Sequence, residues 1–272
     1  MKILVLPDIH GRDFWREPCQ NIEEYDKIVF LGDYLDPYGF EEISVEKAID
    51  NFKDILLFAK DNPKVVMLLG NHDMPYFSST YYGFSTYHCR ISTMHYKEIH
   101  GIFKEHEDLF KIAHHEGDVL FTHAGCLSEW LSSIFDKKYD EKIDLDELCK
   151  ELNDLPNETV GLNLLYMVSS ERGGCDEVGS CIWANWNEMQ YDSVLGEVER
   201  HYAIHDVKQV FGHTLQAFIS SSKVIEKENG SLKLVQNYGF GKALEFKNIK
   251  MIDTGCAYEL ETEEFTINKI SK

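Results

Sequence analysis

Three short apolar runs, with one amphipathic segment before the third, constrain the fold more than any other feature of this sequence. The runs span residues 2–6, 27–31 and 64–69. Residues 45–60 follow the second run, with Ser44 in the position of an N-cap. Their apolar side chains recur at helical spacing: Ala48, Ile49, Phe52, Ile55, Leu56 and Ala59. A strand, helix, strand order predicts βαβ connections and a layered α/β fold.

The rest of the chain predicts a mixture of hairpins, helices and loops. Residues 111–115 and 119–123 predict a hairpin, and residues 126–168 predict mainly helices. Residues 209–211 and 250–252 predict late strands in a strand-rich C-terminal end. Tyrosine and phenylalanine crowd residues 74–108 without a strand or helix period, which we interpret as a loop or a small cap.

Composition limits the partners of this chain. Of 272 residues, 43% are hydrophobic, which is enough for a sizeable core. With 27 Lys and Arg against 47 Asp and Glu, the net charge of −20 disfavours long nucleic acid as a partner unless a local basic patch exists. The first residues do not resemble a signal peptide, and no run reaches membrane-spanning length. Seven scattered cysteines therefore indicate reduced thiols in the cytoplasm.

Each apolar run is followed by a polar motif. The motifs are Asp8-Ile9-His10-Gly11, Gly32-Asp33-Tyr34-Leu35-Asp36, Gly70-Asn71-His72-Asp73, Thr122-His123-Ala124-Gly125 and Gly212-His213-Thr214. A single motif of this kind is often only a polar turn. Five in this order predict one shared site, because open α/β sheets bind ligands at the carboxyl ends of their strands.

The residue types in these motifs suit two divalent metal ions. Imidazoles and carboxylates favour manganese, iron or zinc. Asp8 and His10 lie two apart and can chelate one ion, while a carboxylate such as Asp33 can bridge two. The second set is completed by Asn71, His123 and His213. Two ions about 4 Å apart can hold a hydroxide between them and neutralise a phosphoryl group during in-line attack.

The motifs resemble the calcineurin-like metallophosphoesterase superfamily from Asp8 to about Gly255, with the middle of the chain unmatched. Pro7–Gly11 and Met251–Cys256 look most like the serine/threonine phosphoprotein phosphatase branch, which also holds dinucleoside tetraphosphatases and bacterial polynucleotide end-healing phosphatases. The resemblance implies an α+β four-layer sandwich with two central mixed β-sheets flanked by helices. We expect one domain over 1–272, with a cap or loop insertion around 74–108 and a helical insertion around 126–205.

The resemblance also implies a role for each motif residue. The first metal would be held by Asp8, His10 and Asp33, and the second by Asp33, Asn71, His123 and His213. Two divalent ions are implied, with manganese favoured. His72 would be the general acid for the leaving oxygen, or mainly a cationic stabiliser of the transition state, and Asp36 would orient it. Asp253 would support the site from outside the ligand set.

One departure concerns the phosphate. The family arginine after the last carboxylate of the second motif is absent, because Asp36 is followed by Pro37-Tyr38. A guanidinium pairs bidentately with phosphate, so another arginine is expected to replace it. Arg12 is the first choice, with Arg90 and Arg172 as alternatives, and Asn71 is a further phosphate contact. Tyr258-Glu259 also replaces the glycine pair of the family's C-terminal motif.

These features predict a phosphomonoesterase that uses a metal-bridging hydroxide on a phosphoprotein or a small phosphorylated molecule. A nuclease is disfavoured, because Gly212-His213-Thr214-Leu215 lacks the second histidine of Gly-His-x-His. A nucleotide or dinucleoside polyphosphate hydrolase, or a nucleic-acid end phosphatase, stays open, since tyrosines of residues 76–96 can stack on bases or simply pack. A non-catalytic protein on a relic metal site is the alternative of another class. The oligomeric state is left open.

Overall fold

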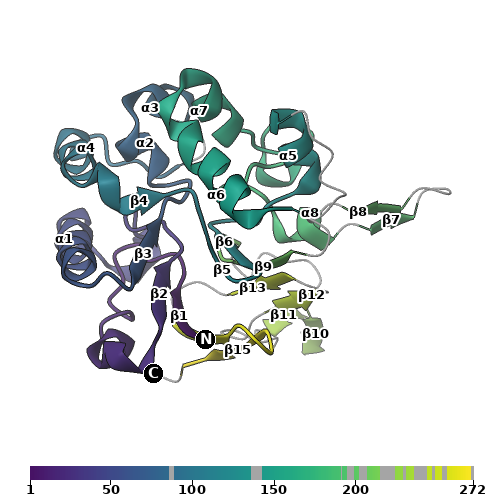
Figure 1. Ribbon diagram of the computed structural model, residues 1–272, viewed down its shortest axis with the longest axis horizontal. Coiled ribbons are helices and arrows are strands. Elements are labelled where there is room, and N and C mark those ends of the chain that lie inside the picture. Colours follow the sequence, from purple (N-terminus) through teal and green to yellow (C-terminus); the bar gives the residue numbers. More distant parts are fainter. Residues whose placement is uncertain are drawn as a thin grey trace.

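Two mixed β-sheets form the centre of the computed structural model (Figure 1). The structure describes residues 1–85, 89–135, 143–190, 192–194, 199–201, 207–214, 224–228, 231–235, 244–246, 249–252 and 256–270. Within these ranges the predicted α/β architecture, with two mixed sheets and flanking helices, is confirmed.

The first sheet contains the three N-terminal runs. Its strand order is β15-β14-β1-β2-β3-β4. Strands β1 to β4 pair in parallel, and β14 and β15 add antiparallel pairs at one edge. The strands are β1 (Lys2–Leu6), β2 (Lys27–Phe30), β3 (Val65–Leu68), β4 (Phe110–Lys111), β14 (Tyr258–Glu261) and β15 (Thr266–Lys269).

The second sheet has the order β12-β13-β9-β6-β5. Its three central strands are parallel, and each edge strand is antiparallel to its neighbour. The predicted hairpin is confirmed as β5 and β6. The strands are β5 (Ala113–Glu116), β6 (Val119–Thr122), β9 (Lys208–Phe211), β12 (Leu244–Phe246) and β13 (Ile249–Met251). Two separate two-stranded sheets pair β7 (Asp192–Val194) with β8 (Glu199–His201), and β10 (Val224–Glu228) with β11 (Ser231–Val235).

The predicted amphipathic helix is α1 (Val45–Asp61), and its N-cap Ser44 accepts a hydrogen bond from the backbone N–H of Lys47 at 3.3 Å. Its apolar positions are buried, as the spacing predicts. The segment after residue 126 contains the predicted helices. These are α5 (Ser128–Phe135), α6 (Leu145–Asp154) and α7 (Thr159–Leu165), and α8 (Trp186–Gln190) follows further along the chain.

Residues 74–108 differ from the sequence-based expectation. Their described part contains three α-helices where neither a helix nor a strand was predicted: α2 (Met74–Phe77), α3 (Ser79–Ser85) and α4 (Tyr96–Glu105). The first two of these helices have only four and seven residues, which is too short to give a sustained helical period. Tyr76 of α2 and Tyr81 of α3 are both fully buried.

The core has an inner and an outer part. Between the sheets lie Ile3, Val5, Val29 and Leu31 of the first sheet with Val119, Phe121 and Val210 of the second. The alternate residues of the same strands, such as Leu4 and Phe30, instead join the cluster that includes the α1 side chains. This alternation follows from the two faces of a strand, and it produces the four layers. In the described part of the chain no helix combines the length and the apolarity that crossing a bilayer requires.

Candidate metal centre

The five sequence motifs meet at the carboxyl ends of parallel strands from both sheets. Asp8 and His10 follow β1, Asp33 follows β2, and Asn71 follows β3. His123 and His213 follow β6 and β9 of the second sheet. Their side chains are buried, with His213 only partly so. Parallel strands point the same way, so residues far apart in the sequence converge at one edge.

Two groups of side chains in this convergence have the spacing of metal ligands. Asp8, His10 and Asp33 form one group, and Asp33, His123 and His213 form the other. Within each group the ligand atoms lie within 4.8 Å of one another. Asp33 belongs to both, which is the arrangement that a bridging carboxylate needs. Asn71 joins the second group, since its Oδ1 lies 3.1 Å from Nε2 of His123.

The backbone at these positions is strained. Among the described residues, five of the seven non-glycine residues with positive φ are candidate site residues: Asp8, His10, Asp33, Asp36 and His213. Positive φ costs energy in residues with a Cβ and concentrates at functional sites. The sharp turn that each residue makes after its strand aims its side chain into the shared site.

Two glycines allow the backbone to approach the candidate ligands closely. A Cβ on Gly70 would overlap Oδ1 of Asp33 and lie 2.8 Å from Cε1 of His123. A Cβ on Gly212 would overlap Oδ2 of Asp8. Neither position therefore has room for a side chain while both carboxylates keep their places.

The imidazoles are oriented as metal-ligating histidines are. Nδ1 of His10 donates to the carbonyl of Leu35 at 2.7 Å, and Nδ1 of His123 donates to the carbonyl of Leu31 at 2.7 Å. Each ring therefore presents its Nε2 lone pair to the site. Nε2 of His213 is buried and has no hydrogen-bond partner among the described residues. Converging lone pairs and an orphaned nitrogen fit a cation, so the residues present fit a metal.

The pKa values of several of these side chains favour the protonation states that bind a cation. Burial lowers the pKa of His10 to about 3, and it lowers the pKa of His213 well below its usual value, so both imidazoles are neutral at pH 7. Burial alone would raise the pKa of Asp33, but the neighbouring imidazoles, His123 most of all, hold it at about 2. Burial raises the pKa of Asp8 to about 6, with the charge of Asp33 adding to the effect.

Asp73 is a site residue to which the sequence-based interpretation gave no role. Its carboxylate accepts hydrogen bonds from the backbone N–H groups of Asp33 at 2.6 Å, Tyr34 at 3.0 Å and Gly70 at 2.8 Å. It therefore ties the loop after β2 to the loop after β3 and fixes Asp33 between the two groups. Its place directly after His72 in the motif was the available signal.

His72 and Asp36 form a pair beside the first group. Nδ1 of His72 lies 2.9 Å from Oδ2 of Asp36, and both side chains are buried. The ring centroids of His72 and His10 are 5.2 Å apart. Because a carboxylate oxygen can only accept, Nδ1 of His72 donates, and its Nε2 is the nitrogen available to a substrate.

The three candidate arginines have different partners. The guanidinium of Arg12 is engaged by Glu41 at 2.6 Å and by the carbonyl of Asp8 at 2.9 Å. Arg90 lies 3.9 Å above the ring of Tyr38 and donates to the carbonyl of Asp36.

Arg172 has a hydrogen-bond donor without a partner among the described residues. It donates from Nη2 to Oγ1 of Thr214 at 2.6 Å, while its buried Nε has no partner among the described residues. Burial lowers the pKa of Arg172, an effect that the nearby Asp8 partly offsets.

Two further expectations from the sequence concern Asp253 and the tyrosines of residues 76–96. Asp253 lies outside the described residues. The described tyrosine rings of residues 76–96 pack on one another and on the core, as with Tyr82 and Tyr96, whose centroids are 4.4 Å apart. This packing is the alternative to base stacking that the sequence left open.

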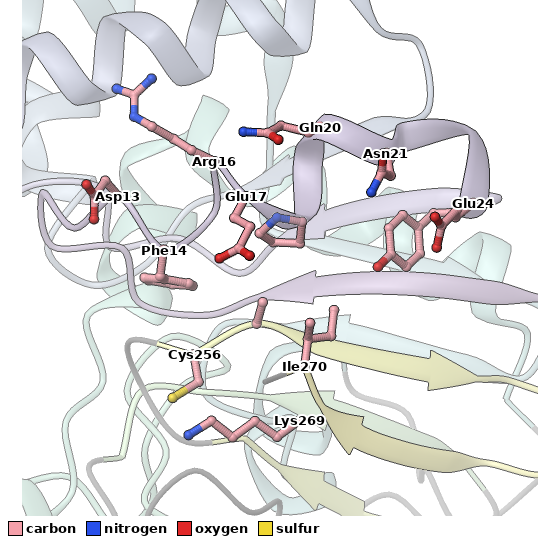
Figure 2. Close-up of a pocket in the computed structure, with 13 residues that line it drawn as sticks. Asp13, Phe14, Arg16, Glu17, Gln20, Asn21, Glu24, Cys256, Lys269 and Ile270 are labelled. Carbon is pink, nitrogen blue, oxygen red and sulfur yellow. The ribbon is translucent and has the colours of Figure 1, made fainter. Parts of the chain in front are cut away.

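A groove of about 540 Å³ lies away from the ligand groups (Figure 2). It is lined by residues of the 3₁₀ segment Pro18–Glu24 and by residues that precede β14 and end β15. Phe14, Cys256 and Ile270 are among the side chains that line it. None of its lining residues belongs to either ligand group. The groove is therefore not part of the candidate metal centre.

Comparison with known proteins identifies the family of this chain. A family model described as calcineurin-like phosphoesterase matches residues 1–217. The chain belongs to the calcineurin-like phosphoesterase family, and it is therefore placed among hydrolases of phosphate esters. No curated protein matches the sequence.

Solved structures resemble the chain at low identity. A cold-active protein-tyrosine phosphatase of a psychrophilic Shewanella species is 16% identical, with a TM-score of 0.48, and the match covers 99% of this chain and 80% of that one. A putative diadenosine tetraphosphatase is 12% identical, with a TM-score of 0.38 and coverage of 99% and 92%. A metallophosphoesterase from Sphaerobacter thermophilus is 12% identical, with a TM-score of 0.33 and coverage of 100% and 89%.

Proposed function

We propose that this chain is a two-metal phosphatase that hydrolyses phosphomonoesters, in the manner of phosphoprotein phosphatases. The observation that carries the proposal is the sharing of Asp33 between two groups of metal-ligand spacing, with the His72–Asp36 pair alongside. A reactive phosphoryl group needs charge neutralisation, an activated water and a proton for the leaving oxygen. The residues gathered here match each of these three needs.

The proposed ligand sets are the two groups extended by Asn71. Asp8, His10 and Asp33 would hold one divalent ion, and Asp33, Asn71, His123 and His213 would hold the other. Manganese is favoured, with iron and zinc as alternatives that the same donors accept. When bound, the ions would activate a water as the nucleophile and neutralise the charge on the phosphoryl oxygens.

His72 is the proposed general acid. Its Nδ1–H is committed to Asp36, so the proton that the leaving oxygen receives comes from Nε2. Asp36 holds the imidazole in that orientation and stabilises its cationic form. Asp253 stays a proposed supporting residue.

Arg172 is the proposed phosphate ligand. Arg12 was the first choice from the sequence, but its Nε and Nη1 are directed at Glu41 and at the Asp8 carbonyl. Arg172 has a buried Nε that finds no partner within the described part of the chain, and it neighbours Thr214, next to the ligand His213. A buried cation with an unused donor is stabilised by a phosphate oxygen. Asn71 stays a second proposed phosphate contact.

Arg172→Ala tests this assignment. We expect kcat/KM to fall by about 10²-fold and inhibition by inorganic phosphate to weaken, because a charged hydrogen bond to phosphate is lost. Arg16→Ala is the matched control, since Arg16 is exposed and pairs with Asp54 away from the ligand groups. Unchanged inhibition by phosphate in Arg172→Ala would exclude this arginine.

A substrate panel tests the function itself. Phosphopeptides, p-nitrophenyl phosphate, nucleotides, dinucleoside polyphosphates and phosphorylated RNA ends would each be assayed with manganese. We expect turnover of monoesters, and phosphopeptides or small phosphorylated molecules as the better substrates. Preference for dinucleoside polyphosphates or RNA ends would select one of those alternatives instead. Binding of two metals without hydrolysis of any of these compounds would select the alternative of a non-catalytic protein with a relic metal site.

A further inference from the structure

The segment that follows the third motif encloses Asp36. Tyr76 in α2 lies only four residues after His72, and its side chain is fully buried. Its hydroxyl donates to Oδ1 of Asp36 at 2.7 Å. The other carboxylate oxygen, Oδ2, faces Nδ1 of His72 at 2.9 Å. Among the residues that the structure describes, Oδ1 and Oδ2 of Asp36 therefore have one side-chain partner each, and the two partners are on opposite sides of the carboxylate.

The direction of the hydroxyl is set by its own neighbours. The backbone N–H of Ser92 donates to the Tyr76 oxygen at 2.6 Å, so the hydroxyl hydrogen is left for Asp36. Burial, and secondarily Asp36, raise the pKa of Tyr76 above its ordinary value, so the phenol stays protonated. The hydrogen bonds thus run in one order, from Ser92 to Tyr76 to Asp36, with His72 donating from the other side.

Further contacts hold this arrangement in place. Arg90 donates to the backbone carbonyl of Asp36 at 2.9 Å, and Asp36 itself has a strained φ of 58°. The Tyr76 ring stacks on Phe103 of α4 at an interplanar angle of 3°, and Nδ1 of His100 donates to the Tyr76 carbonyl. A phenol fixed at both its ring and its backbone has little freedom to leave the carboxylate.

We propose that Tyr76 is a positioning residue for the reaction: its hydroxyl locks the Asp36 carboxylate in the rotamer that aims His72 at the leaving oxygen of the substrate. This inference rests on the proposed phosphomonoesterase function. It gives Tyr76, and through their hydrogen bonds Arg90 and Ser92, a role in positioning the Asp36–His72 pair. The physical basis is that partners outside the reacting groups fix their orientation, and a small misplacement at a reacting centre costs rate.

Tyr76→Phe is the test, because it removes one oxygen and keeps the packed ring. We expect kcat for an alkyl phosphate to fall about tenfold, the lower end of the effect of losing such a supporting partner. The kcat for p-nitrophenyl phosphate should change by less than about twofold, since a good leaving group needs no proton. Metal content and melting temperature are measured on the same samples.

Tyr96→Phe is the matched control. Its hydroxyl is buried at the start of α4, close to the Tyr76 ring, but has no hydrogen-bond partner among the described residues. Both substrates should be turned over at the wild-type rate by this variant. The double variant Tyr76→Phe/His72→Ala should be no slower than His72→Ala alone, because a residue that acts through His72 has no effect without it.

The outcomes separate this inference from the function on which it rests. A wild-type protein with two metals and no phosphatase activity overturns both. An active wild type in which Tyr76→Phe behaves like Tyr96→Phe overturns the positioning role alone. Two further results also overturn the positioning role, because a loss of packing would then explain them. One is an equal fall in kcat for both substrates in Tyr76→Phe. The other is a double variant in which the effects of the two substitutions on kcat add.

Discussion

Gly70→Ala adds one methyl group at the centre of the candidate site, and the structure predicts a large loss of activity from it. The added Cβ would overlap Oδ1 of Asp33 and lie 2.8 Å from both the Asp33 backbone nitrogen and Cε1 of His123. Because the Asp33 backbone on the other side of the Cβ is fixed, the Asp33 carboxylate has to move by about 1 Å. A misplacement of that size can lower the rate by about 10²-fold. Overpacking of this kind also destabilises a fold by about 1–3 kcal/mol.

The assay for Gly70→Ala is metal content, turnover of p-nitrophenyl phosphate and melting temperature on one preparation. We expect loss of metal, activity lower by about 10²-fold or more, and a lower melting temperature. Gly101→Ala is the control, because a Cβ on Gly101 in α4 meets nothing within 4 Å. That variant should keep full activity and gain up to about 1 kcal/mol from helix propensity. A Gly70→Ala protein with two metals and wild-type turnover would refute the reasoning.

Three further predictions concern the metals and the proton donor. Chelation should abolish activity and manganese should restore it, whereas full turnover by a demonstrably metal-free protein would contradict the proposed ligand sets. Asp33→Asn should be worse than Asp8→Asn and should lower the content of both ions, because Asp33 belongs to both groups; two bound ions with normal turnover would exclude bridging. His72→Ala should keep both metals and lower kcat by about 10²–10⁴-fold, most for alkyl phosphates. A series of aryl and alkyl phosphates measures this, and an equal fall for every leaving group would leave His72 only an electrostatic role.

The sequence predicted the N-terminal half of the fold because its signals are local. The β1, β2 and β3 runs are buried on both faces and read as continuous apolar strands, and α1 has a clear stripe and a capping serine. It did not predict α2, α3 and α4. The first two of these have only four and seven residues, which is too short to give the sustained period on which a helix prediction depends.

For the candidate site too, some features follow from the sequence and others only from the tertiary structure. The sequence by itself determined which residue types follow each strand, and hence that Asp33 and four neighbouring motifs could gather at one edge, since chain direction alone brings the ends of parallel strands together. Only the tertiary structure decided which donors were already engaged, as with Arg12 and Arg172, and which distant hydroxyl reaches Asp36. The reason is physical: a hydrogen bond depends on positions accurate to a few tenths of an ångström, and packing between elements far apart in the sequence sets those positions.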